Sequence, residues 1–214
     1  MAKTFPKLYP ILDASFIPAT GRAEFLRRLG GSLAEAGVTL LEYRNKICAE
    51  AVVLADAAVL RDALPVGQVR LILDDRADLV NAIGFDGVHV DAGDLKPAEA
   101  RRLLGPERIV GTFGGGASGM VAGILESQAD YFSVGPVFAT RTKETASPLI
   151  GMDGIRRLRA EAGSAPVLVA IGGITLATVA EAFAAGASVV AMAGGIFREA
   201  DPAVEFRKWM AELG

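Results

Sequence analysis

Short apolar runs recur along the chain at intervals of about 20 to 35 residues, and stretches with helical spacing lie between them. The helical stretches, such as RAEFLRRLGGSLAEAG and TLATVAEAFAAG, repeat apolar residues three and four positions apart and end in glycine, a common residue after a helix C-terminus. The chain therefore alternates strand and helix. The apolar runs predict strands at Leu8–Leu12, Leu40–Tyr43, Val69–Leu73, Gly87–Val90, Ile109–Thr112, Tyr131–Val134, Pro166–Ala170 and Val189–Met192.

The predicted strands are rich in Val, Ile and Leu and do not alternate cleanly with polar residues, which is typical of parallel strands covered by helices. Eight strand and helix units within 214 residues predict an α/β fold, a single (β/α)8 TIM-barrel domain over residues 1–214. An open doubly wound sheet is the alternative. The barrel is favoured because no G-x-G-x-x-G motif opens the first helix, and no linker or low-complexity tract divides the chain.

The charge pattern limits the classes of partner. A formal net charge of −3 without a Lys/Arg stripe gives no footprint for nucleic acid or for an anionic membrane surface, so a bound anion must be held locally. The first residues contain no apolar segment of signal-peptide length, and no run approaches the roughly 18 apolar residues of a membrane-spanning helix. We therefore expect a cytoplasmic protein that acts on small molecules.

The chain has one cysteine, Cys48, and one histidine, His89. This excludes internal disulfides, cysteine-cluster metal sites and multi-histidine zinc sites. We interpret Cys48 as a packing residue and His89, at the end of a predicted strand, as a packed and hydrogen-bonded residue.

Polar and glycine-rich segments gather directly after the predicted strands. Because active sites of TIM barrels lie at the carboxyl ends of the strands, these segments are expected to meet at one mouth of the barrel. The segments are EYRNK, DDR, HVDAGD, GPVFATRTK, IGGI and AGGI.

Three cations, Arg44, Lys46 and Lys143, come from two of these loops. Together they suit a diphosphate, because Arg binds phosphate oxygens bidentately and Lys acts as a compact charge. For each residue taken alone, the alternative is a solvated position on the rim.

Two carboxylates, Asp75 and Asp94, follow consecutive strands. Mg²⁺ prefers one or two carboxylates together with substrate phosphate oxygens, so this pair predicts a magnesium site, with helix capping as the alternative for each residue. Glycine pairs within residues 171–174 and 193–196 follow the last two strands, where phosphate-binding barrels offer backbone N–H groups. The sequence thus predicts a Mg²⁺-bound diphosphate and a phosphate monoester in one mouth.

The segment DYFSVGPVFATRTKETASPLIG, with its Thr-x-Thr-Lys block, resembles the thiamine phosphate synthases, whose superfamily also holds the thiazole tautomerases. The resemblance covers nearly the whole chain, from LYPILD to the final helix. That family joins a hydroxymethylpyrimidine diphosphate to a thiazole phosphate and releases diphosphate, with Mg²⁺ on the leaving group. The resemblance implies a transferase of thiamine biosynthesis and a possible homodimer.

The resemblance also implies roles for individual residues. Arg44, Lys46 and Lys143 would be the catalytic residues that hold the pyrimidine diphosphate, and Asp75 and Asp94 would hold Mg²⁺.

On the thiazole side, the resemblance implies that Thr140 and Thr142 contact the thiazole phosphate. The phosphate would rest on Gly173 and on the Ala193–Gly194 backbone. The remaining substrate-binding residues that it implies are Glu42, Tyr43, Asn45, Asp74, Phe113 and Arg141.

The chain departs from the family pattern around the pyrimidine. Glu42, Asp74 and Phe113 stand where family members usually have Gln, Asn and Ser, and Gly194 replaces a usual Ser. A Gln amide both donates and accepts hydrogen bonds, whereas an ionised Glu only accepts. Recognition of an aminopyrimidine by Glu42 therefore requires a protonated Glu or a protonated ring.

Two other functions compete with the synthase. The tautomerases share the fold but use a His on the loop after the fifth strand, and here that loop reads GTFGGGASG. A catalytically silent barrel that binds a phosphorylated thiazole is the second alternative, and release of diphosphate would separate it from an enzyme.

Overall fold

The computed structural model describes residues 3–91, 93, 95–115, 125–140 and 148–214, and it forms a closed parallel barrel. Each strand pairs with the next, and β8 pairs with β1. The predicted (β/α)8 barrel is confirmed, and the predicted strand ends agree to within one residue except that β5 continues to Gly115. The strands are β1 (Leu8–Asp13), β2 (Leu40–Arg44), β3 (Arg70–Asp74), β4 (Gly87–Val90), β5 (Ile109–Gly115), β6 (Tyr131–Val134), β7 (Val167–Ile171) and β8 (Val189–Met192).

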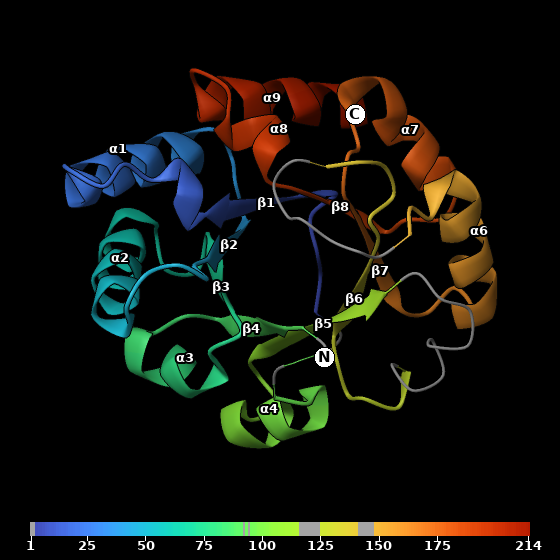
Figure 1. Cartoon of the computed structure of the whole chain (residues 1–214), viewed down its shortest axis with the longest axis horizontal. Helices are drawn as coiled ribbons and strands as arrows, with labels where there is room; N and C mark the ends of the chain where they lie inside the picture. Colours follow the sequence, from blue (N-terminus) through green and yellow to red (C-terminus); the bar gives the residue numbers. More distant parts are fainter. Residues whose placement is uncertain (1–2, 92, 94, 116–124, 141–147) are drawn as a thin grey trace.

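Helices surround the barrel on its outer side, so that the strands lie at the centre of the view in Figure 1. Short local signals fix their ends. The Asp201 side chain accepts hydrogen bonds from the first backbone N–H groups of the last helix, and Gly84 ends another helix in the left-handed conformation. The helices are α1 (Arg22–Glu35), α2 (Glu50–Ala63), α3 (Ala77–Ile83), α4 (Pro97–Leu104), α6 (Gly151–Ala162), α7 (Leu176–Ala184), α8 (Gly194–Phe197) and α9 (Pro202–Leu213), and a short 3-10 turn, η1 (Ala14–Phe16), follows β1.

The strands bury both faces, and alternate residues serve two different cores. On β3, for example, Leu71 and Leu73 pack toward the helices, whereas Ile72 belongs to a separate cluster inside the barrel. The cluster inside the barrel comprises Tyr9, Ile11, Leu40, Ile72, Ile109, Tyr131, Val169, Val189 and Ala191. Because side chains alternate between the two faces of a strand, only every second residue of each strand can reach a site in the barrel mouth.

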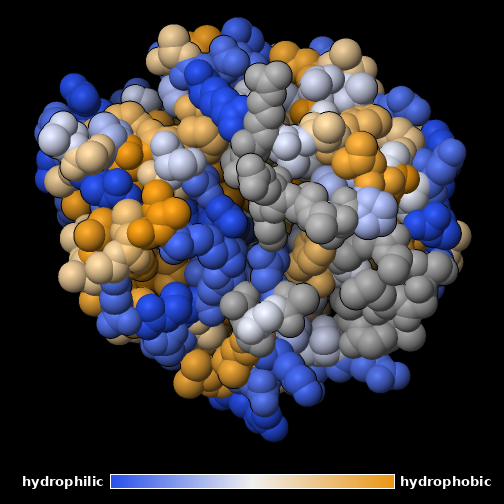
Figure 2. Space-filling model, in the orientation of Figure 1, coloured by the Kyte–Doolittle hydropathy of each residue, from blue (hydrophilic) through white to orange (hydrophobic). Residues whose placement is uncertain are grey.

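Buried polar residues continue these inward positions toward the carboxyl ends of the strands. Glu42 follows Leu40 on β2, Asp74 follows Ile72 on β3 and Ser133 follows Tyr131 on β6, and all three side chains are buried. Hydrophilic residues cross the centre of the face shown in Figure 2, over the strand ends. Among the described residues, no helix is long and apolar enough to cross a membrane.

Candidate active site

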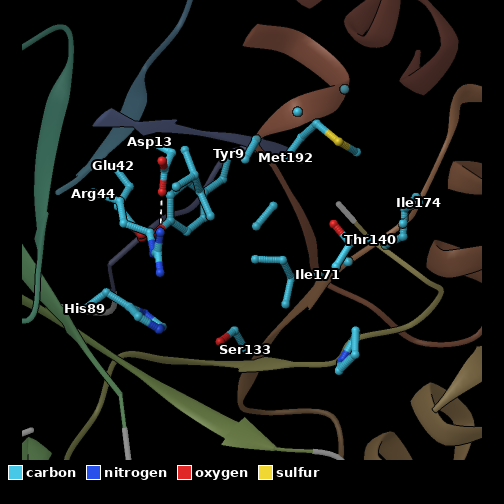
Figure 3. Close-up of a pocket in the computed structure, with 18 of the residues that line it drawn as sticks. Tyr9, Asp13, Glu42, Arg44, His89, Ser133, Thr140, Ile171, Ile174 and Met192 are labelled. Carbon is cyan, nitrogen blue, oxygen red and sulfur yellow. Dashed lines mark hydrogen bonds and ion pairs between the residues drawn. The ribbon is translucent and has the colours of Figure 1, made fainter. Parts of the chain in front are cut away.

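A cavity of about 590 Å³ opens at the carboxyl end of the barrel, a size typical of small-molecule sites. In Figure 3, Glu42, Arg44 and His89 lie on one side of it and Thr140 and Ile174 on the other. The structure therefore brings together residues predicted from loops far apart in the sequence. The predicted site residues that line the cavity are Glu42, Arg44, Asp74, Phe113, Thr140, Gly173, Ala193 and Gly194.

Arg44 ends β2 on the inward face and lies between two carboxylates. Its Nη1 atom donates to Asp13, at the end of β1, and its Nε atom lies 3.4 Å from Asp74 Oδ2. Asp13 in turn accepts hydrogen bonds from the backbone and hydroxyl of Ser15. Burial opposes ionisation of Asp13, but the hydrogen bonds from Ser15 and Arg44 lower its pKa overall. Asp13 thus fixes the guanidinium at the cavity wall.

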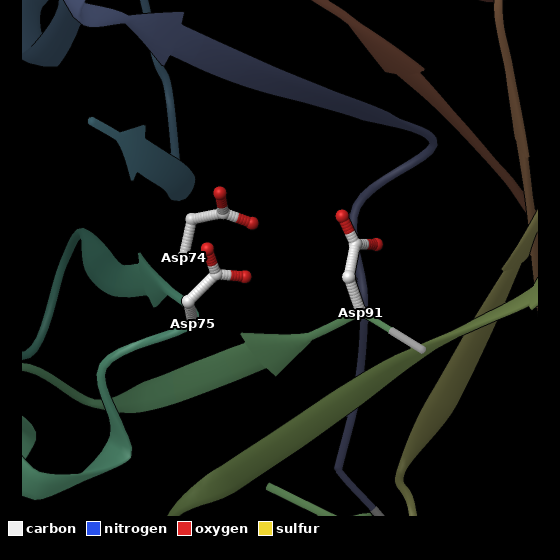
Figure 4. A group of neighbouring side chains, drawn as sticks. All are labelled: Asp74, Asp75 and Asp91. Atoms are coloured by element: carbon white, nitrogen blue, oxygen red, sulfur yellow. The ribbon is translucent and has the colours of Figure 1, made fainter. Parts of the chain in front are cut away.

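Three carboxylates, those of Asp74, Asp75 and Asp91, lie close together (Figure 4), and one oxygen from each lies within 4.8 Å of the others. Lys46 contacts all three, with its Nζ atom 3.2 Å from Asp74 Oδ2 and 3.6 Å from Asp91 Oδ2, and it donates to Asp75. Burial alone would lower the pKa of Lys46, but the carboxylates raise it, so this side chain stays charged. Burial raises the pKa of Asp74 to about 6 despite Lys46 and Arg44.

The acidic cluster fits a divalent cation, because it combines several carboxylate oxygens with a buried one that lacks a hydrogen bond. That oxygen is Asp74 Oδ2, which among the described residues has only ion-pair contacts, with Lys46 and Arg44. Of the two predicted metal ligands, Asp75 is in the cluster, and Asp94 lies outside the described residues. Asp91 was not predicted as a ligand, although it lies in the same HVDAGD segment as Asp94. It follows His89 by two positions, so the strand period of two assigns both residues to the same face.

Asp75 adopts an unusual backbone conformation, with φ of 65°, and its N–H donates to the carbonyl of His89 at 2.8 Å. This bond ties the end of β3 to the end of β4. The capping alternative for Asp75 is wrong, because the N-cap position of α3 is Arg76. The Asp75 side chain is instead directed to the carboxylate cluster.

The opposite wall is made largely of backbone and apolar side chains. Gly173 has φ of 67°, and a Cβ atom there would lie 2.5 Å from the carbonyl oxygen of Ala139, so no larger residue fits without movement. Ile171, Ile174 and Met192, within or next to the two glycine segments, also line the cavity.

One cation that was not predicted also lines this wall. Arg198 follows α8, and its guanidinium lies over the ring of Phe16, 5.7 Å from the centroid. No motif marks it in the sequence, since it lies beyond the glycine pair and the short helix.

Similarity to known proteins identifies the family of this chain. The sequence profile of the family described as "Thiamine monophosphate synthase" matches residues 8–196. The chain belongs to this family. The thiamine-phosphate synthase of Koribacter versatilis is 41% identical over 187 residues, which cover 87% of each chain, and that of Chloroflexus aurantiacus is 35% identical over 96% of this chain and 91% of its own.

The fold agrees with a solved structure of the family. A thiamine phosphate pyrophosphorylase from Pyrococcus furiosus superposes with a TM-score of 0.79, covers 97% of both chains and is 25% identical. The family resemblance drawn from the Thr-x-Thr-Lys block is therefore confirmed. Within that block Arg141, Thr142 and Lys143 lie outside the described residues, so their roles stay predictions.

Two residues that the family resemblance links to substrate have other contacts in this structure. Tyr43 lies on the outer face of β2, where its hydroxyl donates to Asp56, and it does not line the cavity. Asn45 donates to the Tyr43 hydroxyl and accepts from the backbone N–H groups of Ile47 and Cys48. These bonds shape the loop that carries Lys46. A direct substrate contact of Tyr43 or Asn45 remains a prediction.

Several residues of the site were absent from the prediction because they belong to strands rather than loops. Tyr9, His89 and Ser133 all line the cavity. His89 is buried with its Nδ1 atom 3.0 Å from the Tyr131 hydroxyl, as expected of a packed, hydrogen-bonded residue. Their inward strand positions are the signal that could have found them.

Proposed function

We propose that this protein is a thiamine-phosphate synthase. It joins 4-amino-5-hydroxymethyl-2-methylpyrimidine diphosphate to a thiazole phosphate and gives thiamine phosphate and diphosphate. The observation that carries the proposal is one cavity, in a chain of this family, that joins a wall of cations and carboxylates to a wall of glycine backbone. Two substrates with different phosphate groups need two such surfaces facing each other.

The charged wall suits the departing diphosphate. Arg44 is held by Asp13 so that its guanidinium faces the cavity, and Lys46 supplies a second cation beside the carboxylates. Asp75, with Asp74 and Asp91, would hold Mg²⁺, which when bound neutralises negative charge on the leaving oxygens. By family resemblance Asp94 would be a further ligand, and Lys143 a third cation.

The glycine wall suits the phosphate of the thiazole. Gly173 and the Ala193–Gly194 backbone bring main-chain atoms to the cavity surface, and Thr140 stands beside them. Arg198 adds a charge at the same end. Ile171, an apolar side chain of the same wall, offers a surface against which a flat ring can pack.

The chemical step balances without a protein acid or base. The bond between the pyrimidine methylene carbon and the diphosphate oxygen breaks, and both electrons leave with diphosphate. The neutral thiazole nitrogen then donates its lone pair to that carbon and becomes positively charged. Arg44 and Lys46 stabilise charge on the leaving group, and the two walls align the rings, effects that each supply several kcal/mol by order of magnitude.

Two observations bear on the alternatives. The only histidine of the sequence, His89, is on β4 and bonded to Tyr131, and it does not follow β5 as in the tautomerases. Glu42, Asp74 and Phe113, which depart from the family pattern, all line the cavity. They favour as a second candidate a barrel of the same family that has changed or lost its pyrimidine partner.

The test follows both products in one reaction. Purified protein is incubated with Mg²⁺, the pyrimidine diphosphate and the thiazole phosphate, and diphosphate and thiamine phosphate are quantified together. Equal amounts of both products, absent without either substrate, are expected. Binding of the thiazole phosphate with no product would instead support the second candidate.

The setting of the reaction follows the same proposal. We expect a cytoplasmic enzyme whose partners are small molecules, with neither nucleic acid nor membrane involved, in keeping with the formal net charge of −3. A homodimer is expected from the family alone.

A further inference from the structure

Four buried polar side chains form a hydrogen-bonded network across the interior of the barrel, and three of them, Tyr9, Glu42 and His89, line the cavity. The Tyr9 hydroxyl donates to Glu42 Oε2 and lies 2.9 Å from the Tyr131 hydroxyl, which lies 3.0 Å from His89 Nδ1. Each of the four is at most 7% exposed. They come from β2, β1, β6 and β4, so only the closed barrel brings them together.

The neighbouring residues are shaped to accommodate this network. At Gly111 on β5, a Cβ atom would lie 2.0 Å from Tyr131 Cζ, so the ring of Tyr131 occupies the space that a side chain would fill. The ring of Tyr131 meets those of Phe5 and Tyr9 edge to face and stacks on His89. Tyr131 is therefore held by packing as well as by hydrogen bonds.

The number of available protons determines which group donates and which accepts in each hydrogen bond of this network. Each tyrosine hydroxyl has one proton, and the proton of Tyr9 is used toward Glu42. Tyr9 must then accept from Tyr131, and Tyr131 must accept from His89 Nδ1–H. The direction of donation is thus assigned from the bonding pattern, and it fixes Glu42 Oε2 as an acceptor.

Glu42 presents the end of this network to the cavity. Its side chain lines the cavity, and among the described residues no hydrogen bond reaches its other oxygen, Oε1. A carboxyl group pairs with an amidine edge, a ring nitrogen beside an exocyclic amino group, through two hydrogen bonds. One proton lies between the carboxyl oxygen and the ring nitrogen. The pair contains the same protons whether that proton belongs to the carboxyl group or to the ring.

We propose that Tyr9, Tyr131 and His89 are positioning residues, which hold the Glu42 carboxyl group in the orientation that meets the amidine edge of the pyrimidine. The contact between residue 42 and the pyrimidine is itself what the family resemblance implies. The proposal rests on the proposed function, and it deepens it by naming the residues that orient Glu42 for the pyrimidine. It explains how a chain with Glu in place of the usual Gln retains both a donor and an acceptor at this position.

The electrostatic surroundings support a shared proton. Burial of the carboxyl group raises the pKa of Glu42 well above its ordinary value, against the opposing charge of Arg44. A carboxyl group in these surroundings keeps its proton more readily than one in water.

Binding of phosphate-free probes tests the proposal separately from turnover. The probes are 4-amino-5-hydroxymethyl-2-methylpyrimidine and its analogue without the amino group, each titrated calorimetrically, with inorganic diphosphate and Mg²⁺ as a third probe. The ratio of the two pyrimidine affinities measures reading of the amidine edge. For the wild-type protein we expect the amino compound to bind about 100-fold more tightly, as two good hydrogen bonds to a buried group allow.

The ratio of the two pyrimidine affinities is expected to differ among the variants. Glu42→Leu should bring the ratio close to one, Tyr9→Phe should lower it about 10-fold, and Tyr131→Phe by a smaller factor of about three. Glu42→Gln should retain the preference, because an amide both donates and accepts. Ile109→Val is the matched control, since Ile109 packs in the same cluster as both tyrosines but has no polar atom, and it should leave the ratio unchanged.

Several outcomes would overturn the proposal. These are a wild-type protein without preference for the amino compound, a Glu42→Leu protein that keeps the preference, or both tyrosine variants matching the wild type. If Tyr131→Phe does not fold, Tyr9→Phe alone decides. In the active enzyme, the tyrosine variants should raise KM for the pyrimidine diphosphate and leave KM for the thiazole phosphate unchanged. Preference without synthesis of thiamine phosphate would contradict the proposed function and leave this inference standing.

Discussion

The two walls of the cavity are built by different means. Near β2 to β4 charged side chains line the cavity, namely Arg44, Asp74 and Asp91, and Lys46 and Asp75 contact them without lining it. Near β7 and β8 the cavity surface consists mostly of backbone at Gly173 and Gly194 and of apolar side chains. The charged wall depends on the charged groups of its side chains, whereas the glycine wall depends on the absence of side chains at its glycines.

Because of this contrast, each wall suits a different group of the substrates. A diphosphate with a metal ion needs charges that compensate one another, and the charged wall holds them in mutual ion pairs. A phosphate monoester can be bound by main-chain N–H groups if no side chain blocks their approach. Changes to the two walls should therefore affect the two substrates separately, and the predictions test this separation.

Removal of the metal should have the largest effect. With excess chelator, synthesis of thiamine phosphate should fall at least about 1000-fold, because charge on the leaving diphosphate loses its main counter-charge. Binding of the thiazole phosphate, measured calorimetrically, should change less than about twofold, since the glycine wall contains none of the clustered carboxylates. Re-addition of Mg²⁺ should restore synthesis. Undiminished turnover in chelator would contradict a metal role for the cluster.

Arg44→Ala should have the next largest effect. The change removes the guanidinium that faces the cavity and leaves Asp13 and Asp74 without this partner, so kcat/KM for the pyrimidine diphosphate should fall about 100-fold to 1000-fold. Arg44→Lys is the matched variant and should recover part of the loss, because a point charge replaces a bidentate one. An equal rise in KM for the thiazole phosphate would show that the two walls do not act separately.

Gly173→Ala should weaken the glycine wall. The added Cβ atom would meet the Ala139 carbonyl oxygen, so the affinity for the thiazole phosphate should fall about 30-fold while diphosphate binding stays unchanged. Gly84→Ala is the control, because Gly84 has nearly the same φ, 69° against 67°, but open space around it. Both variants should lose about 1 kcal/mol of stability from the left-handed conformation, Gly173→Ala should lose more because of its clash, and only Gly173→Ala should lose affinity. If Gly84→Ala loses as much affinity, strain rather than the cavity wall is responsible.

The fold could be predicted because each strand and helix carries its own signal, and eight repeats leave few topologies. The loop residues of the site could be predicted once the strands were located, because the carboxyl ends of all parallel strands of a barrel meet at one mouth. The alternation of inward and outward positions along each strand would have identified further residues of the site. Glu42 and Arg44 share a face of β2 while Tyr43 lies on the other, and this same period would have assigned Tyr43 to the helix side.

Other parts of the site depend on contacts that no local pattern contains. Tyr9 and Tyr131 are 122 positions apart and meet only because the barrel closes and Gly111 leaves space. The use of Asp13 as the partner of Arg44 depends on the register of β1 against β2, in which these two residues lie side by side. Such registers are fixed by packing of the whole barrel, and so the structure was needed to find them.

A last effect, smaller than the others, concerns the folding stability that Glu42 of the charged wall contributes. The folded pKa of Glu42 is raised by burial and by Asp74, so as pH rises above the ordinary value of 4.5 the unfolded chain loses the proton while the folded protein retains it. The stability that Glu42 contributes is therefore present below pH 4.5 and is lost as pH rises through the folded pKa. Glu42→Gln should be more stable than the wild type at pH 8 by on the order of 1 kcal/mol, and show no such gain at pH 4, in urea unfolding without ligands. A difference that is constant across this range would show that the Glu42 carboxyl group titrates alike in both states, and that the acids of this wall do not repel one another as their positions imply.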